Sequence, residues 1–318
     1  MKPGTMFFYP FALDTNRYAR LQVETLRTLC EQIIPLRFTL VLRNCFSRRS
    51  NVAVLNFYED RTSYHKARPN RTLIQNVAFL LFLRLTCQKI IWVRHNIWPH
   101  DLPRKYLRQD ILLLLMRSLA TTTVTHRQVH GLQARVAPHP LYFEGDLPET
   151  LRDIEFLFFG TIKRYKGLDA LLQAWPKEYR LILAGAVSDP ELFAELKRQA
   201  KARGLDVEFV GRFLSDSELD ALLLRTKFVV LPHREDAMIV AGTFYHAASL
   251  GCNVLTNRSD FSKYLQEQFT FVNVFDALDI GEVVPRLAYV EAQSVVQEVR
   301  MTNGSARCRD AWKPILEL

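Results

Sequence analysis

Short runs of apolar residues alternate with longer amphipathic stretches along most of the chain. Apolar runs of about four to eight residues bounded by turn residues are typical of buried strands, and apolar residues three or four positions apart are typical of helices. In the first half, this pattern predicts strands over residues 6–10, 38–42, 52–57, 89–93 and 121–125, and helices over residues 17–33, 71–85 and 107–119. Such alternation favours a parallel sheet that binds ligands at the carboxyl ends of its strands.

The second half has the same alternation. It predicts strands over residues 154–159, 179–184, 207–210, 227–232 and 269–272, and helices that begin at residue 167 and cover 190–202, 215–225, 261–268, 280–299 and 307–317. Ser215 and Glu218 have the spacing of a capping box. A chain of 318 residues with 48% hydrophobic residues is long enough for two domains. Pro148 marks a linker between them.

The stretch from Leu157 to Leu168 combines a buried strand, a basic turn and the start of a helix. Gly160 follows the strand, and Lys163 and Lys166 lie in the turn. Because a helix N-terminus offers unpaired N–H groups and a positive dipole end, it favours an anion such as phosphate. Two ammonium groups there suit a diphosphate. The alternative is an ordinary strand-to-helix loop with solvated lysines.

A second group of polar residues, Arg94 to Asp101, follows the strand over residues 89–93. His95, His100 and Asp101 resemble metal ligands in type, but their spacing matches no usual zinc site and no cysteine lies nearby. His95 hydrogen-bonded within a turn is another possibility. A catalytic role is the third, since side chains at strand ends commonly carry the chemistry of such sheets.

Positive charge is concentrated in the first half of the chain. Residues 1–150 contain 21 of the 42 Lys and Arg residues and 10 of the 33 Asp and Glu residues, a net charge of +11, and residues 151–318 have a net charge of −2. Arg43, Arg48, Arg49 and Arg68 lie among aromatic residues in this half. Such a surface suits nucleic acid, anionic lipid or a phosphorylated substrate, and the alternative is a solvated basic face.

The five cysteines are scattered without paired or metal-ligand spacing, which is typical of reduced thiols in the cytosol. The N-terminal residues lack the apolar core of a signal peptide. No apolar stretch reaches the roughly 20 residues of a membrane-spanning helix. These observations predict a cytoplasmic protein, soluble or peripheral to a membrane.

The string from Phe159 to Leu168 resembles the F-G-x-I-R-x-Y-K-G motif that opens the second domain of GT-B glycosyltransferases. The resemblance implies two Rossmann-like α/β domains facing a central cleft. The acceptor domain would comprise residues 1–145 and the nucleotide-sugar domain residues 151–300, with a helix over 301–318 returning to the first. Gly160, Lys163 and Lys166 would then hold the donor diphosphate. Lys163 replaces the usual arginine, which keeps the charge but loses the bidentate geometry.

His95 to His100 resembles the H-N-x-x-P-H motif of bacterial exopolysaccharide glycosyltransferases that act on lipid-linked sugars. In those enzymes the first histidine lies at the mouth of the cleft. The candidates for a catalytic base at strand ends are Asp14, Glu59, Asp60, His95 and Asp101. His95 and Asp101 are the residues we select from this set.

The donor motif departs from the commonest pattern of the family, two glutamates eight positions apart. Met238 and His246 stand at those two positions. The stretch is closer to a variant in which backbone N–H groups of Gly242 and Thr243 face the diphosphate, while Glu235 or Asp236 contacts the sugar or the ribose. This departure leaves the transferred sugar and the stereochemistry open.

These resemblances imply a glycosyltransferase that moves a sugar from a nucleotide diphosphate to a lipid-linked oligosaccharide in surface or exopolysaccharide biosynthesis. The donor would be GDP-mannose, UDP-glucose, UDP-glucuronate or a similar nucleotide-sugar. We expect no metal cofactor, because no two aspartates lie two positions apart. The enzyme would be peripheral on the anionic inner face of the cell membrane. The alternatives are a nucleic-acid-binding protein, although no nucleic-acid motif is present, and a nucleotide-sugar epimerase of the same fold.

Overall fold

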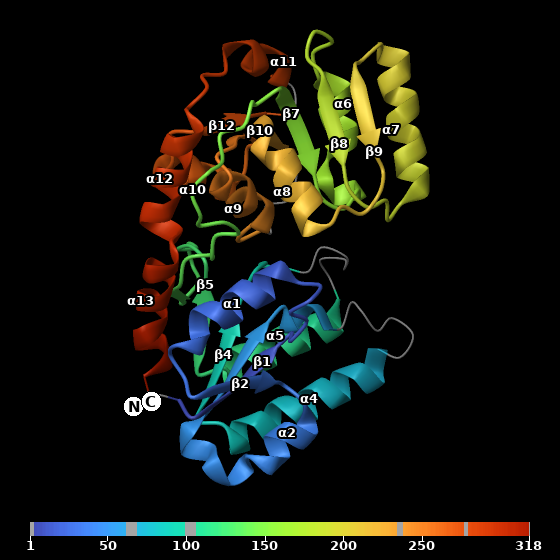
Figure 1. The fold of residues 1–318 in the computed structure, drawn as a ribbon. Coiled ribbons are helices and arrows are strands. Elements are labelled where there is room, and N and C mark those ends of the chain that lie inside the picture. Colours follow the sequence, from blue (N-terminus) through green and yellow to red (C-terminus); the bar gives the residue numbers. More distant parts are fainter. Residues whose placement is uncertain (1–2, 62–68, 99–105, 234–237, 277–278, 318) are drawn as a thin grey trace. The chain divides into compact units, whose positions relative to one another are not determined.

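The structure is a computed structural model that describes residues 3–61, 69–98, 106–233, 238–276 and 279–317. The chain forms two compact units (Figure 1). Unit 1 comprises Met1–Tyr142, Ala237–Val240 and Asn303–Leu318, and unit 2 comprises Phe143–Asp236 and Ala241–Thr302. Each unit has its own sheet and its own core.

Unit 1 contains a six-stranded parallel sheet in the order β2-β1-β3-β4-β5-β6. Its strands are β1 (Thr5–Tyr9), β2 (Gln32–Pro35), β3 (Asn51–Asn56), β4 (Lys89–Val93), β5 (Thr122–Thr125) and β6 (Arg135–Val136). All six residues of β3 are buried, as expected for a central strand covered on both faces.

Helices cover both faces of the unit 1 sheet. The described α-helices are α1 (Arg17–Arg27), α2 (Phe38–Arg43), α4 (Pro69–Thr86), α5 (Leu107–Leu119) and α13 (Ser305–Leu316), and the short 3₁₀ helices are η1 (Cys45–Ser50) and η2 (Tyr58–Asp60). One core joins α1 and the C-terminal α13 to β1, β3 and β4 through residues such as Val23 and Trp312. The other core joins α2, α4 and α5 to the opposite face through residues such as Leu80 and Met116. None of the helices among the described residues meets the length and hydropathy needed to cross a bilayer.

Unit 2 contains a second six-stranded parallel sheet in the order β12-β11-β10-β7-β8-β9. Its strands are β7 (Ile154–Phe159), β8 (Leu181–Ala184), β9 (Val207–Val210), β10 (Thr226–Leu231), β11 (Asn253–Asn257) and β12 (Val272–Phe275). Phe156 and Phe158 of β7 enter one core, and Phe159 contacts His246 of helix α9. The apolar run of β7 is therefore explained by burial on both faces.

The helices of unit 2 alternate with its strands. They are α6 (Leu168–Ala174), α7 (Pro190–Arg203), α8 (Asp216–Leu224), α9 (Gly242–Ser249), α10 (Asp260–Gln268), α11 (Ile280–Val283) and α12 (Ala292–Asn303), with the 3₁₀ helices η3 (Arg164–Lys166) and η4 (Val284–Arg286). Figure 1 shows α6 and α7 beside β8 and β9. The predicted capping box is confirmed at α8, where the Ser215 side chain accepts from the Glu218 backbone and the Glu218 carboxylate accepts from the Ser215 backbone.

Two predicted elements of the first half are wrong in type. Helix α1 ends at Arg27, and the last two residues of the expected helix, Gln32 and Ile33, belong to the edge strand β2. The run Phe38 to Leu42, expected to be a strand, is the helix α2, in which only Val41 is buried. A short apolar run fits a strand or one face of a helix, and packing against the rest of the molecule decides between them.

The predictions near the C-terminal end of the sheet also differ from the structure. The last strand is β12 rather than residues 269–272, and β11 was not predicted. The helix expected over residues 280–299 is divided into α11, η4 and α12. Pro285 lies in η4, where a residue without an N–H group cannot continue an α-helix.

Candidate functional site

In the sheet of unit 2, the order in which successive strands are added reverses between β7 and β10. From β7 the chain proceeds to β8 and β9 on one side, and then returns to place β10, β11 and β12 on the other. In open parallel sheets, ligands bind beyond the carboxyl ends of the strands at such a point. Gly160 follows β7 there, and Pro232 and His233 follow β10.

The turns that follow β7 and β8 approach each other closely at Gly160. Its φ of +125° is a conformation that residues with a Cβ rarely adopt, and its N–H donates to the carbonyl of Ala184. Gly185 also has a positive φ, and a Cβ there would come within 2.0 Å of the Gly160 carbonyl oxygen. A Cβ on Gly160 would lie 3.9 Å from the Thr243 methyl group. The fold thus brings together Gly160 and Thr243, which are far apart in the sequence.

Thr243 lies in the first turn of α9, which Gly242 begins. The residue before it, Ala241, has an extended backbone and provides no side-chain cap. The Oγ1 of Thr243 is buried and has no hydrogen-bond partner among the described residues. A buried hydroxyl without a partner beside uncapped helix N–H groups is suited to an oxygen of an anionic ligand.

Lys166 extends to the adjacent strand. Its Nζ lies 2.6 Å from Nε2 of His233, and it also lies 5.0 Å from the centre of the Tyr165 ring. Lys163 is half-buried in extended backbone directly before η3. Arg164 of the same turn instead forms exposed ion pairs with Asp189 and Glu195. The contact with His233 joins Lys166 to the end of β10.

His246 stands at the position where the resemblance to GT-B glycosyltransferases implies a glutamate. It is buried, and its Nε2 lies 2.5 Å from Oδ1 of Asp220 on α8. Its ring meets that of Phe159 edge to face at 5.7 Å. The structure therefore pairs this histidine with a carboxylate supplied by another helix.

A separate cluster in unit 1 surrounds His95, which follows β4. The His95 ring stacks on Phe57 with 3.8 Å between ring centres. The ring centres of Tyr18 and His126 lie 4.9 Å and 5.0 Å from that of His95, with the Tyr18 ring edge to face and the His126 ring tilted. The side chain is 4% exposed, and its Nε2 has no hydrogen-bond partner in the part of the chain that the structure describes. Its backbone carbonyl accepts from the N–H of Ile239.

Burial keeps the histidines of this cluster neutral. The pKa of His95 is well below its usual value because the ring is removed from water and because His126 and His139 lie close by. Burial lowers the pKa of His126 to about 4. His126 Nδ1 lies 2.9 Å from the carbonyl oxygen of Ala137 and therefore carries the hydrogen. Its Nε2 lies 3.0 Å from the Tyr18 hydroxyl, which donates its hydrogen to Oδ1 of Asn56. Because its pKa is lowered, His95 is neutral near pH 7 and one of its ring nitrogens has a free lone pair.

Glu59, another proposed base, is buried rather than open to solvent. It is 1% exposed, and its Oε2 accepts from the indole N–H of Trp92 at 2.9 Å. Burial raises the pKa of Glu59, while the Trp92 hydrogen bond and the charge of Arg94 oppose the rise. Of the other proposed bases, Asp14 is exposed and Asp60 is half-buried.

Several predicted site residues lie outside the described part of the structure. These are Arg68, Asp101, Glu235 and Asp236. Arg43, Arg48 and Arg49 are exposed on α2 and η1, in the company of three exposed apolar residues, Phe38, Leu42 and Phe46. No group of three or more His, Cys, Asp or Glu residues within the described ranges is arranged to hold a metal ion.

Sequence reasoning missed four residues of these sites: Tyr18, His126, Gly185 and His233. His126 and His233 both come shortly after the carboxyl ends of strands, and this position could have identified them as candidates from the sequence. The contacts of Tyr18 and Gly185 depend on segments distant in sequence, so no local pattern reveals them.

Residues 144–264 match the protein family described as glycosyl transferases group 1. No curated protein matches the chain. Residues 144–264 therefore form a glycosyltransferase domain, which confirms the predicted class of enzyme.

Solved structures of the same fold cover nearly the whole chain. Anabaena Alr3699/HepE in complex with UDP and glucose has a TM-score of 0.67 at 13% identity, over 98% of this chain and 99% of that one. The UDP-forming α,α-trehalose-phosphate synthase of Burkholderia vietnamiensis has a TM-score of 0.58 at 12% identity, over 96% and 80%. An α-glucosyltransferase in complex with UDP-glucose and abasic DNA has a TM-score of 0.58 at 10% identity, over 99% and 95%. These likenesses confirm the predicted α/β fold with two parallel sheets.

Proposed function

We propose that this chain transfers a sugar from a nucleotide diphosphate to a lipid-linked oligosaccharide in surface or exopolysaccharide biosynthesis. Residues 151–300 would bind the nucleotide-sugar, residues 1–145 the acceptor, and residues 301–318 would complete the acceptor domain. In unit 2, Gly160, Lys163, Lys166, Gly242 and Thr243 would hold the diphosphate. The negative charge that develops on the departing diphosphate would be stabilised by the lysines and by the N–H groups of α9.

One observation carries the donor assignment. Within the matched glycosyltransferase domain, the Gly160 turn and the first turn of α9 come together where the strand order reverses. Lys166 contacts the end of the neighbouring strand β10 at the same edge. A ligand at the carboxyl ends of these strands would meet the backbone of Gly160, the hydroxyl of Thr243 and the ammonium group of Lys166. These groups suit phosphate oxygens.

The donor sugar is proposed from the chemistry of the structural neighbours. Two of them are complexes with UDP and glucose or UDP-glucose, so a UDP-sugar such as UDP-glucose or UDP-glucuronate is our first choice and GDP-mannose our second. Glu235 or Asp236 would contact the sugar or the ribose. The lysines would do the work that a divalent ion does in other transferases, so chelation of metal ions should leave activity unchanged.

His95 is the group that we assign to the acceptor reaction. An imidazole that is neutral near pH 7 and has an unpartnered Nε2 is able to accept the proton of a sugar hydroxyl. The stacked Phe57 ring and the Tyr18 edge hold its orientation. Asp101 would assist from the same loop.

The surface of α2 and η1 supports a lipid-linked acceptor on an anionic membrane. Phe46 is 99% exposed and lies between Arg43 on one side and Arg48 and Arg49 on the other in the sequence. Apolar side chains that enter the interface and cations that face anionic headgroups together favour binding to the inner face of the cell membrane. Arg68 would add to this charge, and the enzyme would be cytoplasmic and peripheral.

Vesicle sedimentation tests the membrane assignment. We expect the protein to bind vesicles containing phosphatidylglycerol more tightly than vesicles of phosphatidylcholine, and Phe46→Ser or Arg48→Glu to weaken that binding. Phe213→Ser is the matched control, because Phe213 is an exposed phenylalanine of unit 2. Equal binding to both vesicle types would contradict the assignment. Tighter binding to DNA would favour the nucleic-acid alternative.

Thermal unfolding with nucleotides tests the proposed activity. A ligand present at 100 times its Kd stabilises the folded state by about 2.7 kcal/mol. We expect either UDP or GDP, and the corresponding nucleotide-sugars, to raise the Tm, and the stabilising nucleotide-sugar to release its nucleoside diphosphate when a polyprenyl-diphosphate-linked saccharide is added. If none of these nucleotides raises the Tm, the donor assignment is wrong. Interconversion of the donor sugar without transfer would favour the epimerase.

A further inference from the structure

The contact between Lys166 and His233 has a fixed polarity. The two nitrogens, Nζ and Nε2, lie 2.6 Å apart, and the His233 side chain is buried. An ammonium group has donors only. The imidazole must therefore accept at Nε2, which places its own hydrogen on Nδ1 and leaves the ring neutral in this contact.

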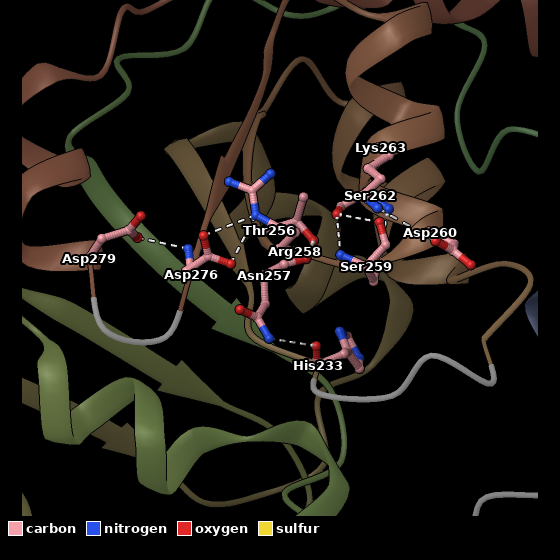
Figure 2. Close-up of polar contacts among 10 residues, drawn as sticks. All are labelled: His233, Thr256, Asn257, Arg258, Ser259, Asp260, Ser262, Lys263, Asp276 and Asp279. Atoms are coloured by element: carbon pink, nitrogen blue, oxygen red, sulfur yellow. Dashed lines mark hydrogen bonds and ion pairs between the residues drawn. The ribbon is translucent and has the colours of Figure 1, made fainter.

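Neighbouring strands hold His233 in place. Its backbone carbonyl accepts from Nδ2 of Asn257, at the end of β11, at 3.2 Å (Figure 2). The carbonyl of Leu231, two residues earlier, accepts from the hydroxyl of Thr256 at 3.3 Å. The ring of Tyr165 lies 6.4 Å from the imidazole. His233 is thus attached to the rigid edge of the sheet, whereas Lys166 is a long side chain on a short 3₁₀ turn.

A neutral acceptor has a specific advantage at an anion site. A carboxylate would also hold a lysine, but it would cancel the lysine's charge and repel a phosphate group. An imidazole restricts the rotamers of the lysine and adds no negative charge. The entropy cost of ordering the lysine side chain is then met before the ligand binds.

We propose that His233 is a positioning residue of the diphosphate site. Its neutral imidazole accepts a hydrogen bond from the Lys166 ammonium and so holds that ammonium at the carboxyl ends of the adjacent strands β7 and β10. This inference rests on the proposed function, because it takes the ligand to be the diphosphate of the donor. In this proposal His233 does not contact the donor itself and acts through Lys166.

Three substitutions at His233 separate hydrogen bonding from charge. His233→Gln keeps a neutral acceptor, His233→Glu keeps an acceptor but adds negative charge, and His233→Leu removes the acceptor. The probes are UDP and UMP, or GDP and GMP if the wild-type protein prefers guanine. The ratio of the two affinities reports on the diphosphate, because a general loss of structure weakens both nucleotides alike.

We expect the glutamine variant to bind the diphosphate within about threefold of wild type, since the neutral hydrogen bond is retained. The glutamate variant should bind it at least about tenfold more weakly, with a smaller loss for the monophosphate, because like charges repel. The leucine variant should fall between them. Equal diphosphate-to-monophosphate ratios in wild type and the glutamate and leucine variants would overturn the proposal.

A double substitution keeps the test decisive if the glutamate variant does not fold. In the Lys166→Ala background, His233→Leu should cause no further loss of diphosphate affinity, because the residue acts through the lysine. Independent, additive losses would overturn the proposal. If the wild-type protein binds neither UDP nor GDP, the donor site itself is wrong and the role of His233 falls with it. Wild-type binding that is insensitive to His233 refutes the positioning role alone.

Discussion

Gly185 lies directly against Gly160: a Cβ on Gly185 would be 2.0 Å from the Gly160 carbonyl oxygen and 2.7 Å from its carbonyl carbon. Both atoms belong to the backbone, so no side-chain rotation relieves the overlap. Gly185 also has a φ of +150°, which disfavours any residue with a side chain. The turn that follows β7 and the turn that follows β8 therefore fit together only if Gly185 is a glycine.

Gly185→Ala should both destabilise unit 2 and displace the Gly160 turn. We expect a loss of about 2–4 kcal/mol in the free energy of unfolding, as for other overpacked or strained positions, and a weaker affinity for the nucleoside diphosphate. Urea unfolding and calorimetric titration measure the two effects. Gly204→Ala is the matched control: Gly204 has a φ of +64° but no atom within 4 Å of the added methyl, so it should lose only about 1 kcal/mol. Equal losses in the two variants would contradict the close fit.

Thr243→Val should separate ligand binding from stability. Because the buried Oγ1 has no hydrogen-bond partner among the described residues, removing it should leave the free energy of unfolding unchanged or raise it by up to about 1 kcal/mol. A hydrogen bond to a charged phosphate contributes about 1.5–3 kcal/mol, so the affinity for the diphosphate should fall at least tenfold.

Thr226→Val provides the opposite case. The Thr226 hydroxyl donates to the carbonyl of Leu222 at 2.8 Å. Thr226 is the first residue of β10, at the end of the strand that is remote from the proposed site. This variant should lose stability and keep its affinity. If Thr243→Val instead loses stability and keeps affinity, the hydroxyl is structural and does not face the ligand.

His95→Gln tests the catalytic assignment in unit 1. Loss of a general base typically lowers a rate by about 10²- to 10⁴-fold. We therefore expect kcat to fall by at least 100-fold while donor affinity is retained, because the residues proposed to bind the donor diphosphate lie in unit 2. Steady-state kinetics and titration with UDP or GDP measure the two quantities. His130→Gln, an exposed histidine of the same unit, is the control. A kcat close to that of wild type would assign the base elsewhere, for example to Asp101.

The sequence predicts the elements of the proposed diphosphate site better than it predicts the histidine cluster. The strand, turn and helix from Ile154 to Ala174 lie within one continuous stretch, so local patterns determine them. The approach of Thr243 to Gly160 follows from β7 and β10 being neighbours in a parallel sheet. By contrast, the contact of Tyr18 with His126 joins α1 to the end of β5, and sequence alone contains no measure of that distance.

The two errors of element type in the first half have a common cause. Residues 32–35 and 38–43 are short, and their hydrophobic pattern fits either type of element. The choice depends on the available edge of β1, which β2 occupies, and on Val41, which belongs to the same core as residues of α4 and β3. Long periodic segments such as α5, whose bounds were predicted correctly, leave no such choice.

The histidine cluster should make the stability of the fold dependent on pH. The pKa of His126 is about 4 in the folded chain and near 6.5 when unfolded, so the unfolded chain binds more protons between these values. The stability is therefore fully present above about pH 6.5 and is lost as the pH falls towards 4, by on the order of 3 kcal/mol for this group. Urea unfolding between about pH 7.5 and pH 5 measures the loss.

Removing the titrating group should reduce this pH dependence. His126→Gln should show a smaller loss of stability between the same two pH values, whereas His130→Gln should behave as the wild type does. The pKa values of His95 and His139 are also lowered by burial, so part of the dependence should persist in the His126 variant. A wild-type protein equally stable at both pH values would show that the cluster is open to water.

The turnover of Lys166→Ala decides whether the basic turn of unit 2 stabilises a departing diphosphate. The assay measures kcat with the nucleotide-sugar that stabilises the wild-type protein, alongside Lys201→Ala, which removes an exposed lysine of α7. We predict that kcat falls by at least about 100-fold in Lys166→Ala, as it does in other enzymes when one hydrogen-bond donor to the developing charge is removed. The free energy of unfolding of this variant should change by less than about 1 kcal/mol, and Lys201→Ala should retain full activity. Full turnover of folded Lys166→Ala with an intact nucleotide-sugar would contradict this role.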